Sequence, residues 1–162
     1  MKPAELLDLL REFYAGKAGM RQSHAAGAAF VGDYDFNNTY QYIIAREDMH
    51  LRWLIDAITE LGGSVEDAPC PERKAAGKAT AAQGQIIRED RDAAQAFVDR
   101  WRDPVETVTN ARNRMLLRVI LGETLEHRRF FDQALAGRTD LLGRRADGAG
   151  TEGVVLPTRW VE

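Results

Sequence analysis

The sequence contains little cysteine and no long apolar run, and its positive and negative charges nearly balance. A single cysteine in 162 residues cannot form an internal disulfide, which is typical of a reducing compartment and predicts a cytoplasmic protein. No segment approaches the roughly 18 consecutive apolar residues of a membrane span. The net charge of −3 lacks the basic excess of a general nucleic-acid binder. We therefore expect neither a membrane nor a nucleic acid as partner.

Hydrophobic spacing predicts four helical segments. Apolar residues recur at intervals of three, four and seven over four segments. The first three span about 3–31, 38–61 and 81–101, and the fourth begins between 103 and 109 and ends near 136. Gly16 and Gly19 predict a kink or break in the first segment, because glycine costs about 1 kcal/mol against alanine in a helix. Gly62 with Gly63, and Gly137, are expected to end the second and fourth helices.

The start of the fourth helix has two interpretations. Residues 103–106 (DPVE) have the pattern of a helix start, with an aspartate cap, proline at the first position and glutamate at the third. Alternatively, Thr107 or Thr109 caps the main helix.

The connection between the second and third segments is long. A helix of 22 residues measures about 33 Å, and about ten extended residues cover that length. The stretch 62–80 can therefore return along the helix and make the two segments parallel. Short, long and short connections predict an all-α protein, a four-helix bundle of two antiparallel hairpins joined by a crossover. We expect residues 1–136 to form this bundle and residues 137–162 a tail with a flexible part and a docked, extended apolar end.

Charged side chains interrupt the apolar stripes of two helices. Glu47 lies at the centre of the second stripe, with His50 still within it. Glu123 lies in the fourth stripe and His127 beside it, when that stripe is drawn through Leu116, Val119, Ile120, Phe130 and Ala134. Carboxylates are almost never fully buried without a partner. Because carboxylate oxygen and imidazole nitrogen suit iron, manganese and zinc, these four residues predict a metal site.

The other two helices offer further candidate ligands. His24 follows the first stripe and comes level with Glu47 across the intervening turn, and Asp90 lies in the middle of the third stripe. Three carboxylates beside the stripes are alternatives: Glu12, Glu89 and Glu126. For any one of these residues, the ordinary role is a boundary side chain that reaches solvent or a hydrogen-bonded core histidine.

At residues 3–136 the chain resembles the ferritin-like superfamily, which includes bacterioferritins and rubrerythrins. The resemblance depends on Glu47-Asp48-Met49-His50, which matches that family's Glu-x-x-His motif, on the long crossover, and on Glu123, Glu126 and His127 in the last helix. It implies two metal ions inside the bundle, iron or manganese; the carboxylate and imidazole donors also allow zinc. It also implies an oxidoreductase acting on oxygen or peroxide, or iron storage.

The chain departs from the family pattern at several positions. Thr124 stands where the second motif has glutamate, so His127 pairs with Glu123 instead. The first helix has no glutamate on its apolar face, and the third offers Asp90 or the off-stripe Glu89. A single-metal site or a metal-free descendant is therefore an alternative to the di-metal centre.

Two further classes fit the same pattern. DinB-type bundles hold one metal ion with three histidines, and this chain has three in all: His24, His50 and His127. The other class is a helical interaction protein without chemistry. Second apolar faces on the second and fourth helices predict a homo-oligomer or cover from the tail; their residues are Tyr42, Met49 and Trp53, and Leu117, Leu121, Leu125 and Leu135.

Overall fold

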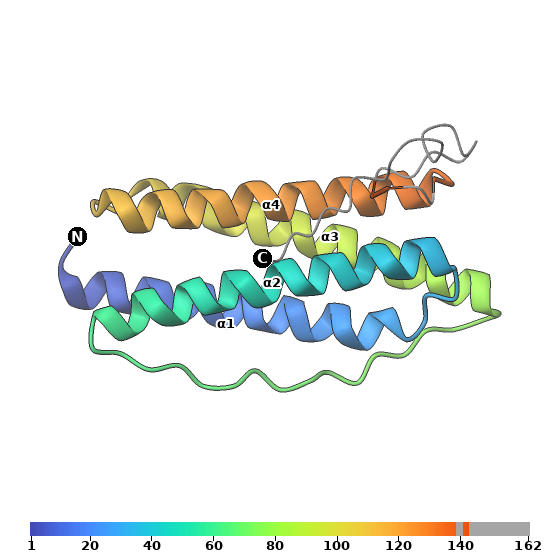
Figure 1. Cartoon of the computed structure of the whole chain (residues 1–162), viewed down its shortest axis with the longest axis horizontal. Coiled ribbons are helices and arrows are strands. Elements are labelled where there is room, and N and C mark those ends of the chain that lie inside the picture. Colours follow the sequence, from blue (N-terminus) through green and yellow to red (C-terminus); the bar gives the residue numbers. More distant parts are fainter. Residues whose placement is uncertain (139–140, 143–162) are drawn as a thin grey trace, which may run out of the picture.

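The computed structural model describes residues 1–138 and 141–142, and this part of the chain contains four helices and no strand. The helices lie side by side along one long axis (Figure 1), and their bounds are α1 Pro3–Ala28, α2 Tyr34–Glu60, α3 Ala79–Glu106 and α4 Ala111–Leu135. None of these four helices combines the length and the apolar character needed to cross a membrane. The predicted all-α bundle is confirmed, while the expected tail lies almost entirely outside the described residues.

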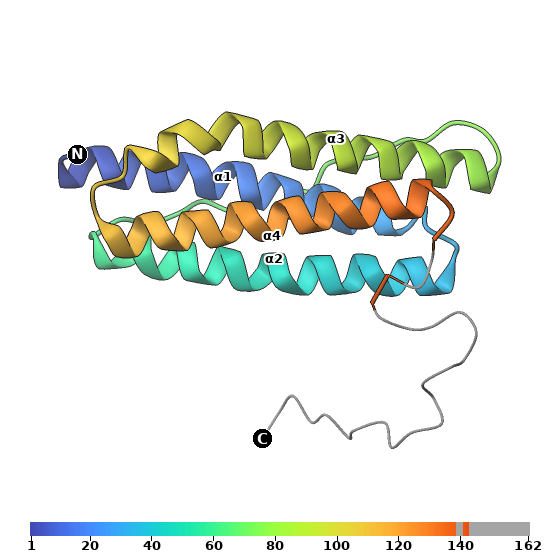
Figure 2. The ribbon, with the colours of Figure 1, turned by 90° about the horizontal axis from the view of Figure 1, so that it is seen from above.

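The long connection has the effect that its length predicts. It returns along the outside of the bundle from the end of α2 to the start of α3, so these two helices run in the same direction (Figure 1). Around the bundle, α1 contacts α2 and α3, and α4 contacts the same two helices. As a result, α1 and α4 face each other across one diagonal, and α2 and α3 across the other (Figure 2).

The ends of α2 and α4 follow the local sequence signals. The Asp33 carboxylate accepts a hydrogen bond from the Phe36 amide at 2.8 Å, so α2 begins at Tyr34, earlier than predicted. Gly62 and Gly137 adopt the left-handed conformation, with φ of 77° and 88°, just beyond the two helices. Glycine takes this conformation without a Cβ penalty, and both predicted stops are confirmed.

Helix α1 continues through Gly16 and Gly19, so the predicted break is wrong. A Cβ atom at Gly16 would lie 3.1 Å from the Phe97 ring of α3. Glycine therefore allows α1 and α3 to approach closely, and the tertiary packing outweighs its low helix propensity.

The boundary between α3 and α4 also differs from the prediction. Helix α3 continues through Pro104 to Glu106. Residues 103–106, which were predicted to start the fourth helix, therefore end the third. A proline in the last turn removes only one backbone donor, and the Thr107 hydroxyl donates to the Pro104 carbonyl at 2.7 Å. The cap of α4 is Asn110, whose side chain accepts from the Asn113 amide at 3.0 Å, and not Thr107 or Thr109.

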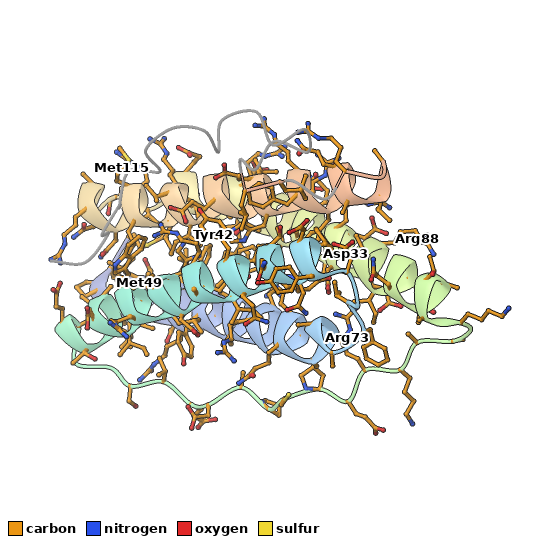
Figure 3. All side chains as sticks on the ribbon, turned by 45° about the vertical axis from the view of Figure 1, so that its right-hand side comes forward. Asp33, Tyr42, Met49, Arg73, Arg88 and Met115 are labelled. Carbon is orange, nitrogen blue, oxygen red and sulfur yellow. The ribbon has the colours of Figure 1, made fainter. Side chains whose placement is uncertain are left out.

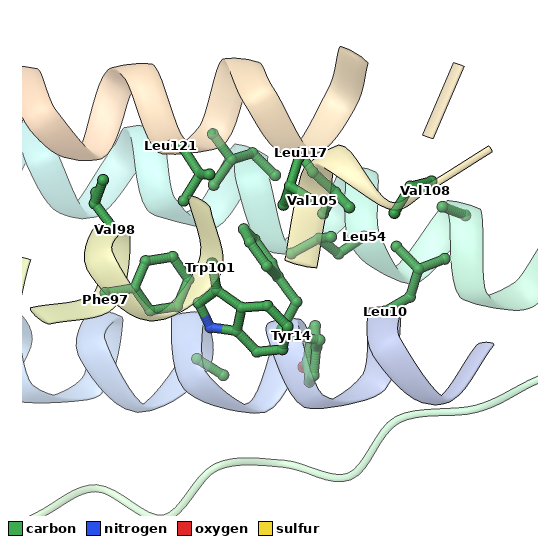
Figure 4. Close-up of a cluster of buried hydrophobic side chains, with 14 of the residues drawn as sticks. Leu10, Tyr14, Leu54, Phe97, Val98, Trp101, Val105, Val108, Leu117 and Leu121 are labelled. Carbon is green, nitrogen blue, oxygen red and sulfur yellow. The ribbon is translucent and has the colours of Figure 1, made fainter. Parts of the chain in front are cut away.

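The apolar core consists of two clusters with a polar layer between them. One cluster, around Phe13, Trp101 and Leu117, fills the end of the bundle where α3 meets α4 (Figure 4). The other, around Phe36 and Phe131, fills the opposite end. Between the clusters each helix contributes buried polar side chains, which are Lys17, His24, Glu47, His50, Asp90, Thr124 and His127.

Helix α4 presents a different face to the core from the one predicted. Leu117 and Leu121 are buried, whereas Val119 is 41% exposed. A shift of one residue turns a helical face by about 100°, so Thr124 points to the centre where Glu123 was expected. The predicted second apolar face of α4 is therefore largely core, because a helix with two apolar stripes leaves the choice to tertiary packing.

The second apolar face of α2 is incompletely covered within one chain. Tyr42 is 40% exposed, and Met49 and Trp53 are half-buried. Across from them, Met115 and Val119 of α4 help to line a surface groove with Trp53. Figure 3 labels Tyr42, Met49 and Met115 on these two helices. The homo-oligomer expected from this face stays a prediction.

The cap of α4 gives a direct test of the corrected boundary. We expect Asn110→Ala to lower the free energy of unfolding by about 1 kcal/mol, because the Asn113 amide loses its acceptor. Thr109→Ala, one residue away and exposed, should change it by less than about 0.5 kcal/mol. Urea unfolding followed by circular dichroism measures both. A larger loss in Thr109→Ala would place the cap at the threonine instead.

Candidate functional site

A lysine lies at the centre of the polar layer. Lys17 of α1 has no exposed surface, and its Nζ atom donates to Glu47 Oε1 at 2.8 Å and to Thr124 Oγ1 at 3.1 Å. The Thr124 hydroxyl in turn donates to the Ile120 carbonyl at 2.8 Å. Since α1 and α4 are diagonal partners, this side chain spans the inside of the bundle. The buried Glu47 carboxylate thus has a cation supplied by the chain itself.

His24 completes the surroundings of this carboxylate. Its Nδ1 atom lies 2.8 Å from Glu47 Oε2, so the predicted pairing of the two across the α1–α2 turn is found. Burial alone would raise the pKa of Glu47, but His24 and Lys17 outweigh burial and hold that pKa well below its ordinary range. Glu47 is therefore ionised, with a hydrogen-bond partner on each oxygen.

A second carboxylate lies nearer the surface and holds an imidazole. Glu123 Oε2 lies 2.8 Å from His50 Nε2, and Arg46 binds both oxygens of Glu123 at 2.6 and 3.0 Å. The Glu123 side chain is 24% exposed, whereas His50 is fully buried. Burial lowers the pKa of His50, so the ring is neutral. Because Nε2 faces a carboxylate, we assign the ring proton to Nε2 and the lone pair to Nδ1.

His127 is the second buried imidazole of the layer. Its ring stacks on His50, with 6.3 Å between centroids and 20° between planes. Burial, followed by the charge of Lys17, lowers the pKa of His127 to about 3, so this ring is also neutral at pH 7. Among the described residues, neither His50 Nδ1 nor His127 Nδ1 has a hydrogen-bond partner, although both atoms are buried. An unpaired buried nitrogen costs about 1–3 kcal/mol, so this pair of atoms calls for an explanation.

The two helices α2 and α4 contribute matching pairs to this arrangement. Glu47 and His50 are one turn apart on α2, and Thr124 and His127 are one turn apart on α4. Lys17 connects the first members of the two pairs, and the second members stack on each other. The partner of His127 on the inner face is therefore Thr124, not Glu123 as predicted.

Asp90 belongs to a separate cluster, although it is buried as its position predicted. The Tyr40 hydroxyl donates to its Oδ2 at 2.5 Å across the α2–α3 diagonal, and Arg73 donates to its Oδ1 at 2.6 Å. Arg73 also donates to the Ser23 carbonyl and to Glu89 (Figure 3 labels Arg73). These bonds fasten the crossover to α1 and α3. Burial raises the pKa of Asp90 above its ordinary value.

The three alternative carboxylates lie outside the polar layer. Glu12, Glu89 and Glu126 are all exposed, and the first two pair with Arg100 and Arg73. None of the three takes the place of a buried candidate ligand.

The residues of the layer do not fit a di-metal carboxylate centre. Each buried or half-buried carboxylate is paired with a cation of the chain: Glu47 with Lys17, Glu123 with Arg46, and Asp90 with Arg73. In the part of the chain that the structure describes, no three His, Cys, Asp or Glu side chains form a group able to hold a metal ion. Two buried imidazole nitrogens have no hydrogen-bond partner among the described residues, and imidazole nitrogen is a common metal ligand.

Lys17 was not predicted from the sequence as a residue of the polar layer, although its spacing along the first helix indicated a buried position. It lies on the same helical stripe as Leu10, Phe13, Met20 and His24, at spacings of three, four and seven residues. A lysine on a buried stripe is rare without a partner, and Glu47 on the next helix supplies one. Arg73, by contrast, lies in the irregular crossover, where no periodicity marks it.

Known proteins were compared with this chain by sequence and by structure, and only the structural comparison gives a match. No family model matches the chain, and no curated protein matches it. Among solved structures, the chain is similar to a ferritin-like, diiron-carboxylate protein from Bacillus anthracis str. Ames, with a TM-score of 0.67 and 20% sequence identity. The match covers 83% of this chain and 99% of that one.

The neutral histidines predict acid-sensitive stability in metal-free protein. The folded state keeps His127 unprotonated down to a pKa of about 3, whereas the unfolded chain binds a proton near pH 6.5. Stability contributed by the neutral ring is therefore present above pH 6.5 and is lost as the pH falls toward 3. The charged and titratable groups that act on this ring are Lys17, Glu47, His24 and His50.

Between pH 7 and pH 5 we expect the free energy of unfolding to fall by about 2 kcal/mol for His127 alone. His127→Leu should lose this part of the pH dependence and retain the smaller part that comes from His50, whose pKa is also lowered. Urea unfolding at the two pH values measures the difference. Equal losses in the two proteins would show that His127 titrates normally in the folded state.

Proposed function

We propose that this bundle binds one transition-metal ion through the imidazoles of His50 and His127. The observation that carries the proposal is the pair of buried Nδ1 atoms without partners on two stacked, neutral rings. Neutral imidazole is the form that coordinates metal ions, and a bound ion would satisfy both nitrogens at once. The sequence predicted both histidines as ligands, and the proposal retains them.

Glu123 and Arg46 are proposed to orient the first ligand. In protein metal sites a coordinating histidine commonly donates its other ring N–H to a carboxylate, which fixes the ring and its tautomer. The contact of Glu123 Oε2 with His50 Nε2 has this form, and Arg46 holds the carboxylate in place. Glu123 would therefore be a positioning residue and not the ligand expected from the sequence.

The remaining candidates take other roles in this proposal. Glu47, one turn from His50, is the nearest carboxylate along the helix, and it is already paired with Lys17 and His24. His24 supports Glu47 through its hydrogen bond, and Asp90 anchors Tyr40 and Arg73. The site is then mononuclear and rich in histidine, which separates it from the di-metal centre that the family resemblance implies.

The nature of the ion follows from the donors. Imidazole suits iron and zinc, and manganese prefers the carboxylates that this site has already paired. We therefore place iron first and zinc second. Bound iron would supply reactivity toward oxygen or peroxide, and bound zinc would supply Lewis acidity without redox change. The diiron-carboxylate description of the similar Bacillus anthracis protein supports iron as the first metal to test.

Metal titration of chelator-treated protein tests the proposal. We expect one Fe(II), Co(II) or Zn(II) ion per chain, and an affinity loss of about tenfold or more in His50→Ala and in His127→Ala. Glu126→Ala, an exposed change beside His127, is the matched control and should bind as the natural chain does. Circular dichroism confirms that each variant is folded.

Two results would contradict the site. Unchanged affinity in both histidine variants would remove the proposed ligands. Binding of two ions per chain would contradict the mononuclear site and favour a di-metal centre. If one Fe(II) binds, stopped-flow absorbance in the presence of oxygen then separates a redox protein, with saturable oxidation faster than in buffer, from a protein that only holds the ion.

A further inference from the structure

The ammonium group of Lys17 is a buried positive charge in the middle of the polar layer. Its side chain is 0% exposed, and a lysine is almost never fully buried unless it is paired. Three elements hold it: Glu47 on α2, Thr124 on α4, and the Phe97 ring of α3, whose centroid is 5.7 Å from Nζ. All four helices thus take part in enclosing this one cation.

The histidine pair lies within the field of this cation. Lys17 binds Glu47 and Thr124, and each of these residues lies one helical turn from one of the two histidines, so the ammonium group is close to both rings. A divalent ion at the rings would meet the same positive charge. It would also find Glu47 Oε1 already bonded to Lys17 at 2.8 Å and Oε2 bonded to His24. Repulsion and an occupied carboxylate both act against the incoming ion.

We infer that Lys17 is a resident competitor for metal: its ammonium group occupies Glu47, and an ion at His50 and His127 gains that carboxylate only by displacing the lysine. The inference rests on the proposed metal site and specifies what sets its affinity. It also explains why the layer holds a threonine opposite Glu47. Thr124 accepts a hydrogen bond from an ammonium group and adds no negative charge that would need a second cation.

Removing the lysine charge tests the inference. Lys17→Met keeps an unbranched side chain of similar length and frees Glu47. We expect Zn(II) and Co(II) to bind about tenfold more tightly than to the natural chain, because Glu47 Oε1 is then available as a ligand while Oε2 keeps its bond to His24. The absorbance of bound Co(II) and isothermal titration calorimetry with Zn(II) give the two affinities.

A double variant provides the matched control. Lys17→Met with Glu47→Gln removes the same lysine but leaves no free carboxylate, so its metal affinity should not exceed that of the natural chain. In the absence of metal, Lys17→Met alone should unfold at a lower temperature than the double variant, since the buried Glu47 charge has lost the cation that binds Oε1. Saturating Zn(II) should raise the unfolding temperature of Lys17→Met more than that of the natural chain.

Thr124→Val keeps the inference testable if Lys17→Met folds poorly. Valine has nearly the shape of threonine; it removes the second acceptor of Lys17 and the hydroxyl's own bond to the Ile120 carbonyl. The lysine is then held less firmly, and we expect metal affinity to rise about threefold, a smaller gain than in Lys17→Met.

The outcomes separate this inference from the proposed function. If the natural chain binds metal and neither Lys17→Met nor Thr124→Val binds it more tightly, the inference is wrong and the metal site stands. If only the lysine variant binds metal, the inference is supported and the proposed function of the natural chain is wrong. If no variant binds metal, both are wrong.

Discussion

The rest of the structure depends on one constraint, which is that the charge of Glu47 is buried among four helices and must be balanced there. A buried carboxylate without a partner costs several kcal/mol or takes up a proton. In this chain Lys17 and His24 of α1 provide the balance, and both reach Glu47 at 2.8 Å. The ion pair in turn requires Thr124 on α4 to satisfy the ammonium group across the bundle diagonal. One carboxylate therefore determines the polar contributions of three helices.

The same principle governs Asp90 in the layer and Glu123 at its edge. Glu123 is balanced by Arg46 from the neighbouring helix, and Asp90 by Arg73 from the crossover. Because the chain supplies each cation, these carboxylates are charge-balanced by the protein itself.

The histidines are the part of the layer that this balance leaves open. Their rings are neutral and buried, and one nitrogen on each has no partner. The fold is similar to that of a diiron-carboxylate protein, yet Glu47, Glu123 and Asp90 are each paired with a cation of this chain. The result is two buried imidazoles beside a carboxylate that Lys17 already binds.

Much of the fold could be predicted from the sequence, because helical periodicity and glycine stops are local signals. The length of the connection between α2 and α3 allowed their parallel course to be predicted. Counting residues on either side of the α1–α2 turn predicted that His24 and Glu47 lie at the same height in the bundle. The inner face of α4 could not be predicted, because two apolar stripes gave equal local patterns and tertiary packing chose Leu117 and Thr124.

Charge balance was predicted only in part. The need for a partner to Glu47 was evident, and a metal ion was the expected solution, but the lysine on the first stripe was an equally good one. Arg73 reaches Asp90 from an irregular segment, where sequence spacing carries no information on which side chain folds back.

The state of Lys17 is the most direct test of this account. The chain has four lysines, and Lys2, Lys74 and Lys78 are exposed. A ¹H–¹⁵N correlation spectrum of the lysine ammonium groups in metal-free protein should therefore contain one signal protected from exchange with water, and Lys17→Met should lack it. If all ammonium signals exchange rapidly with water, Lys17 is not a buried cation and Glu47 must be balanced in another way.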